Sequence, residues 1–99
     1  MARPATFYDE QAVGLVWVEY DLTVWERVCG IVISNDANPT INPGSHLFVS
    51  FDHGDGMAFR LKAGESMTWD YGFGEGVHLI NVRSNVTALP KRIHAWGQR

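Results

Sequence analysis

The chain has 99 residues, which suits one domain with a thin hydrophobic core. Hydrophobic residues make up 45% and charged residues 19%, a balance typical of a globular protein and not of a disordered one. The formal net charge of −3 argues against direct binding of nucleic acid. The single cysteine, Cys29, excludes an intrachain disulfide and a cysteine cluster for a structural metal.

The first residues, Met1 to Ala5, are not followed by an apolar run, so the sequence predicts no signal peptide. No stretch is long and apolar enough to span a membrane. We therefore expect a protein of the cytoplasm, or of a particle assembled there.

Residues 1–12 are polar and carry Phe7 and Tyr8 outside any alternating pattern. We expect an N-terminal arm that lies on a partner, or else a frayed terminus. The remaining residues, 13–99, are expected to form a single β-sandwich domain. On that view, deleting residues 1–10 would weaken partner binding and leave the fold intact.

Residues 16–24 place an apolar side chain at every second position, which predicts one long strand or two strands with a bend. Residues 25–34 are rich in β-branched side chains and predict a central strand. Its Gly30 predicts a bulge or a close backbone approach. Trp25 is in the apolar phase and is expected in the core.

The clearest hairpin spans residues 47–61. Two alternating segments flank Asp52–Gly56, whose glycines supply the positive φ angles of a tight turn. Further strands are expected at residues 67–71, with Trp69 in the core, and at 77–84. Because Pro90 precedes it, the last strand, at 91–96, is expected at a sheet edge.

No segment has a helical period, and seven or eight short strands are separated by turns. This pattern predicts an all-β fold, an antiparallel β-sandwich of jelly-roll type.

The four histidines provide the main candidate for a metal site. His46, His53, His78 and His94 lie in or beside different predicted strands. A three-histidine site across strands is geometrically possible, as in a cupin-like metalloenzyme, but the His-x-His pair of cupins is missing at His46. Surface or turn histidines are the preferred interpretation.

Other chemical motifs are incomplete. Asp52–Gly56 lacks the third acidic position and the distal glutamate of a calcium loop. Cys29 lies within an apolar strand, where a buried, inert thiol is expected. Gly72–Gly76 lacks the lysine and the helix of a phosphate-binding loop. We therefore predict no catalytic, cofactor-binding or metal-binding residues, and no enzyme activity.

Aromatic and basic residues are the remaining candidates for function, because such side chains are enriched at protein interfaces. Trp17 is out of phase with its apolar neighbours, and the C-terminal end is locally basic. The predicted interface residues are Arg3, Phe7, Tyr8, Trp17, Phe73, Lys91, Arg92 and Trp96.

Several segments resemble small structural proteins of tailed-phage virions. These are Val28–Asn35, Leu47–Asp52, Asn81–Asn85 and above all Phe59–Ser66, where Lys62-Ala63-Gly64-Glu65-Ser66 follows an apolar strand. The similarity covers about residues 25–96 and is a pattern of strands and turns.

This resemblance implies a non-enzymatic capsid decoration (cement) protein, or a tail or spike component. It implies copies in trimers or other rings, a major capsid protein or other virion subunits as partner, a location in the virion and no cofactor. The alternative is a carbohydrate-binding module, or a receptor-binding component, that stacks exposed aromatic side chains on sugars.

Overall fold

The computed structural model describes residues 3–51, 59–70 and 78–99. Within them lie eight strands: β1 (Pro4–Asp9), β2 (Val18–Asp21), β3 (Arg27–Asn35), β4 (Leu47–Phe51), β5 (Phe59–Leu61), β6 (Ser66–Asp70), β7 (Leu79–Ser84) and β8 (Lys91–Gln98).

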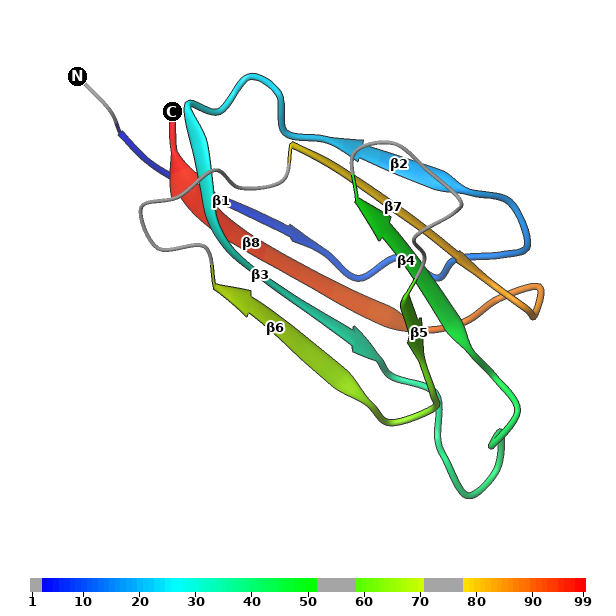
Figure 1. Cartoon of the computed structure of the whole chain (residues 1–99). Coiled ribbons are helices and arrows are strands. Elements are labelled where there is room, and N and C mark those ends of the chain that lie inside the picture. The colour runs from blue at the N-terminus through cyan, green and yellow to red at the C-terminus, as the bar shows by residue number, and fades with distance from the viewer. Residues whose placement is uncertain (1–2, 52–58, 71–77) are drawn as a thin grey trace.

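The strands form two layers (Figure 1). Sheet I has the order β1-β8-β3-β6 and sheet II the order β2-β7-β4-β5, and every pairing is antiparallel. Because one core cluster draws side chains from both sheets, they pack face to face as a sandwich. The prediction of an all-β antiparallel sandwich is confirmed.

The core follows from the period of two in the strands. In β3, Ile31 and Ile33 are fully buried, and in β7 Ile80 and Val82 face them from sheet II. Trp25 is buried as predicted, just before β3 begins. Trp69, also predicted for the core, is half-buried and meets Phe51 edge to face at a ring-centroid distance of 4.9 Å.

The N-terminal segment differs from its expected role as an arm. Residues 4–9 form β1, which pairs with β8 from Pro4↔Gln98 to Asp9↔Ile93. Ala5 is buried, and Phe7 packs on Tyr20 of β2 with ring centroids 5.4 Å apart. Of the inward side chains of β1, two are apolar, Ala5 and Phe7, and one is charged, Asp9. The sequence of this strand therefore lacks a clear alternation of apolar residues. A deletion of residues 1–10 would remove an edge strand of sheet I.

The last strand also differs from the prediction, because β8 lies between β1 and β3 and not at an edge. Pro90 stands before the strand, so every residue of β8 keeps the backbone N–H that a central strand requires. The expectation for residues 25–34 was correct, since β3 lies between β8 and β6.

The alternating run at residues 16–24 is ordered as a strand only at 18–21. Val16 is 77% exposed and Val24 is 74% exposed, whereas Leu22 is buried. Because β2 lies at the edge of sheet II, solvent lies along its open side. Apolar side chains in and beside this strand are therefore exposed despite the alternating pattern.

The predicted hairpin is present as β4 and β5, which pair from Leu47↔Leu61 to Val49↔Phe59. Its turn at 52–56 lies outside the described residues. Gly30 lies at a bulge, as one of the two expectations had it, because the register shifts between Val28 and Gly30. The group that lies closest to it is the side chain of Trp96 and not another backbone. In the described part of the chain, no helix is long and apolar enough to cross a bilayer.

Candidate docking face

Strand β8 divides the C-terminal residues between the core and the surface. Ile93 and Ala95 are fully buried, so Arg92, His94 and Trp96 point away from the core onto the outer face of sheet I. The outer surface therefore receives a cation and two aromatic rings from a single strand.

Strand β1 adds a third ring to this surface. Tyr8 lies opposite His94 in the antiparallel register, and their ring centroids are 6.2 Å apart. His94 is in turn 5.5 Å from the ring of Trp96. Together Tyr8, Arg92, His94 and Trp96 form what we call the aromatic face. Tyr8 is 57% exposed, so the row is open to a partner at this end.

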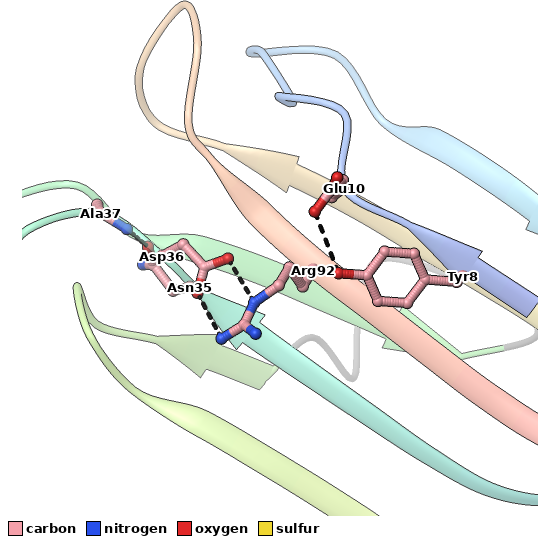
Figure 2. A network of polar contacts seen from close by, with 6 residues as sticks. All are labelled: Tyr8, Glu10, Asn35, Asp36, Ala37 and Arg92. Carbon is pink, nitrogen blue, oxygen red and sulfur yellow. Dashed lines mark hydrogen bonds and ion pairs between the residues drawn. The ribbon is translucent and has the colours of Figure 1, made fainter.

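Arg92 is held in place by a carboxylate from the loop after β3. Its Nε donates to Asp36 Oδ2 at 2.8 Å and its Nη2 donates to Asp36 Oδ1 at 3.2 Å (Figure 2). This two-pronged contact fixes the guanidinium plane, and the hydrogen bond that Arg92 donates to Asp36 raises the pKa of Arg92. The arginine side chain nevertheless stays 54% exposed and presents a fixed positive charge.

Tyr8 is likewise held in place by a carboxylate, that of Glu10 directly after β1. Its hydroxyl donates to Glu10 Oε2 at 3.1 Å, a contact drawn in Figure 2, and this hydrogen bond raises the pKa of the phenol. At neutral pH the ring therefore carries a neutral hydroxyl at its exposed tip.

Two open hollows flank Arg92. One, of about 420 Å³, lies between Arg92, the loop from Ser34 to Pro39 and the turn at Gly64. The other, of about 250 Å³, lies between Tyr8, Val32 and His94. Their walls combine backbone, hydroxyl, cationic and aromatic groups, which suits a docked peptide segment or a polar ring.

The position of Trp96 depends on a glycine in the neighbouring strand. A Cβ atom at Gly30 would lie 2.1 Å from Cζ2 of Trp96. The absence of a side chain at Gly30 therefore leaves the space that the indole of Trp96 occupies beside β3. This packing keeps Trp96 only half-exposed, at the inner end of the aromatic row.

Lys91 was predicted as an interface residue, and this prediction is wrong. Its side chain points into the sandwich, and the residue is 1% exposed. Its ammonium group donates to Asp9 Oδ2 of β1 and lies 5.2 Å from the ring centroid of Tyr20. Tyr20 donates its hydroxyl to the same carboxylate oxygen at 2.7 Å. These three groups form a polar cluster between the sheets.

The opposite charges of Lys91 and Asp9 attract each other in this cluster. Burial acts to raise the pKa of Asp9, but the hydrogen bonds from Lys91 and Tyr20 outweigh it and hold this pKa below its ordinary value. Burial, together with the bond to Asp9, raises the pKa of Tyr20. Lys91 is therefore a structural residue of the core and is unable to contact a partner.

The other predicted interface residues lie apart from the aromatic face. Arg3 is exposed beside the chain end and exchanges two backbone hydrogen bonds with Arg99, whereas Phe7 points inward. Phe73 lies outside the described residues. Trp17 lies on the outer face of sheet II, where the guanidinium carbon of Arg83 is 5.2 Å from its ring centroid.

Sequence reasoning missed two contributors to the aromatic face. His94 was considered only as a metal ligand, although its alternation with Arg92 and Trp96 places all three on one side of β8. Asp36 was part of a predicted loop, and no local signal connects it to Arg92, which is 56 residues away.

Among residues 3–51, 59–70 and 78–99, no three His, Cys, Asp or Glu side chains gather closely enough to hold a metal ion. His53 lies outside these ranges. Cys29 is a free thiol that is half-buried, whereas a buried thiol was predicted, and it lies at the bulge of β3.

Comparison with known proteins yields similarity in fold. No family model and no curated protein matches the chain. A solved structure from Bacillus, described as showing that endospore appendages form a novel family of disulfide-linked pili, is similar with a TM-score of 0.67 and 7% sequence identity over 96% of this chain and 85% of that one. A de novo designed double-stranded β-helix has a TM-score of 0.43 and 14% identity over 98% of this chain and 99% of that one. At 7% identity, the first match establishes a shared β-sandwich fold.

Proposed function

We propose that the chain is a non-enzymatic structural protein of a virion that binds a repeated capsid surface through the aromatic face. The observation that carries this proposal is the convergence of Tyr8, Arg92 and Trp96 on one outer surface. Tyrosine, tryptophan and arginine are the residue types most enriched at energetically important interface positions. The partner is then the major capsid protein or another virion subunit, with neither nucleic acid nor membrane involved.

The physical advantage of such a role lies in repetition. The open hollows beside Arg92 offer only a moderate contact area to one partner. When copies are linked across a lattice, moderate contacts add up to strong attachment. The ordered Arg92–Asp36 pair lowers the entropy lost on binding, because the guanidinium is already fixed.

The architecture supports a structural role in a second way. The strand orders β1-β8-β3-β6 and β2-β7-β4-β5 agree with the jelly-roll type that we expect. The similar solved structure from Bacillus is described as belonging to the disulfide-linked pili of endospore appendages. A location in the virion, after assembly in the host cytoplasm, is part of the same proposal.

Particle binding tests the role of the aromatic face. Purified protein is sedimented with virions prepared from a lysate whose phage lacks the gene for this chain. We expect Tyr8→Ala and Arg92→Ala each to weaken binding by about tenfold or more, as interface residues of this kind do. The charge-matched control, Arg83→Ala, alters the outer face of sheet II and should bind normally. Equal binding by all three variants would contradict docking through this face.

A carbohydrate-binding module is the second candidate, favoured by the row of Tyr8, His94 and Trp96 beside a hollow of about 250 Å³. Aromatic rings on a sheet face can stack on sugar rings. If this candidate is correct, a glycan will change the tryptophan fluorescence of the protein, and Tyr8→Ala will reduce that response. A fluorescence spectrum unchanged by every member of a glycan panel would exclude it.

A further inference from the structure

The two lateral edges of the sandwich carry most of its exposed apolar side chains. One edge, which we call flank A, consists of β1 and β2. The other, flank B, consists of β5 and β6. Eight large hydrophobic residues are exposed in the described part of the chain, and seven of them lie on or next to these flanks. They are Tyr8 on β1, Leu15, Val16, Val18 and Val24 around β2, Phe59 on β5 and Met67 on β6.

The backbone at each edge of sheet II is available for pairing. Leu22 N–H donates to His78 O, so the alternation directs the backbone groups of Glu19 and Asp21 away from β7, toward the free edge. On the opposite edge, Leu47 and Val49 pair with β5, and the backbone of Arg60 points outward by the same alternation.

The charges of the two edges are complementary. The outer side chains of β2 include Glu19 and Asp21, both acidic and exposed. Flank B carries two basic residues, Arg60 on β5 and Lys62 directly after it, and one acidic residue, Asp70 on β6, and all three are exposed. Two copies of flank A would repel each other, whereas flank A of one copy attracts flank B of another.

Strand direction permits this contact. Along sheet II, β2, β7, β4 and β5 alternate in direction, so β5 of one copy and β2 of an identically oriented copy are antiparallel. The inward side chains then also match, since Val18 and Tyr20 on β2 meet Phe59 and Leu61 on β5. Joining the edges buries exposed apolar surface and satisfies backbone groups at once.

We propose that the chain associates with further copies of itself head to tail, with flank A of one copy against flank B of the next. Such a heterologous contact uses a different surface on each partner. It closes into a ring, such as the expected trimer, if the rotation between copies permits, and otherwise extends as a filament. Tyr8 lies on β1 of flank A, but the proposed contact joins β2 to β5 at the edges of sheet II, whereas the aromatic face lies on the outer face of sheet I. The proposal is therefore independent of the proposed capsid docking.

Charge reversal provides the test, with the full chain itself as the binding partner. The mass of the native protein is measured by light scattering over a wide range of concentrations. We expect the wild type to form rings or filaments, and Glu19→Lys and Arg60→Glu each to weaken the association by about tenfold or more. Glu26→Lys makes the same charge change outside the strands and should assemble like the wild type.

Mixing separates a specific contact from damage to the fold. Glu19→Lys removes the net negative charge of the β2 edge, and Arg60→Glu removes the net positive charge of the β5 edge, so each variant loses the attraction between its own flanks. In a mixture, the unchanged β2 edge of the Arg60→Glu variant attracts the unchanged β5 edge of the Glu19→Lys variant. An equimolar mixture should therefore regain the assembly that each variant lacks. A wild type that stays monomeric at every concentration, or variants that assemble as well as the wild type, would overturn the proposal. A monomer that still binds particles would overturn it without touching the proposed function.

Discussion

Replacing Asp9 with alanine is expected to lower the free energy of unfolding by about 3–5 kcal/mol. The substitution leaves the ammonium group of Lys91 buried between the sheets without its carboxylate, at 0% side-chain exposure. It also removes the acceptor of the Tyr20 hydroxyl. Urea denaturation followed by circular dichroism measures the change.

A double variant serves as the control for this effect. Asp9→Leu combined with Lys91→Met replaces the ion pair by apolar side chains of similar size and should recover most of the lost stability. If Asp9→Ala alone costs less than about 1 kcal/mol, the charge on Lys91 is not buried as described.

The same pair predicts how stability changes with pH. The pKa of Asp9 is lower in the folded than in the unfolded chain, so its contribution is complete above the unfolded value of about 3.9. The contribution is lost as the pH falls through the lower, folded pKa. The wild type should therefore lose more stability on acidification than the Asp9→Leu/Lys91→Met variant does.

Replacing Asn35 with alanine is expected to cost about 3–5 kcal/mol. The fully buried amide of Asn35 donates to Ser45 O and to Leu61 O, both at 2.9 Å, and accepts from Ala37 N at 3.1 Å. The side chain thereby joins β3 of sheet I to β5 of sheet II. Alanine would leave two carbonyl groups and one N–H without this partner. The midpoint of urea unfolding reports the loss.

Asn38 provides a matched control, since its side chain makes the same kind of turn contact in solvent. Its Oδ1 accepts from Thr40 N at 2.8 Å and the residue is exposed. Asn38→Ala should cost no more than about 1 kcal/mol, because water replaces the lost contact. Equal effects at the two positions would contradict a bridging role for Asn35.

Local sequence patterns predicted the inner strands well. β3, β4 and β7 are rich in apolar side chains, and buried and half-buried positions largely alternate along them, because each strand lies between two neighbours and turns one face to the core. The edge strands β1 and β2 were predicted poorly, whereas the edge strands β5 and β6 lie close to their predicted positions. β1 has only Ala5 and Phe7 as inward apolar residues, and the apolar run around β2 is largely exposed.

The sequence predicted only part of the aromatic face, because the pairing of strands decides which side chains share a surface. Tyr8, Arg92 and Trp96 were chosen by residue type, and only the pairing of β1 with β8 brings them to one surface. Lys91 and Arg92 are adjacent basic residues, yet one is buried and the other is exposed. Residue type alone does not distinguish them, because the two sides of a strand have opposite surroundings.

The sequence by itself determined the all-β class, the β4–β5 hairpin and the bulge at Gly30, since these depend on neighbouring residues and on side-chain size. The tertiary structure decided which strands lie at the edges, which side chains share a face and where charges are buried. Asp9 and Lys91 are 82 residues apart, and their contact arises only when β1 pairs with β8 and β2 closes over them. Long-range pairing of this kind leaves no local pattern, because its free energy comes from the packed sandwich and not from adjacent residues.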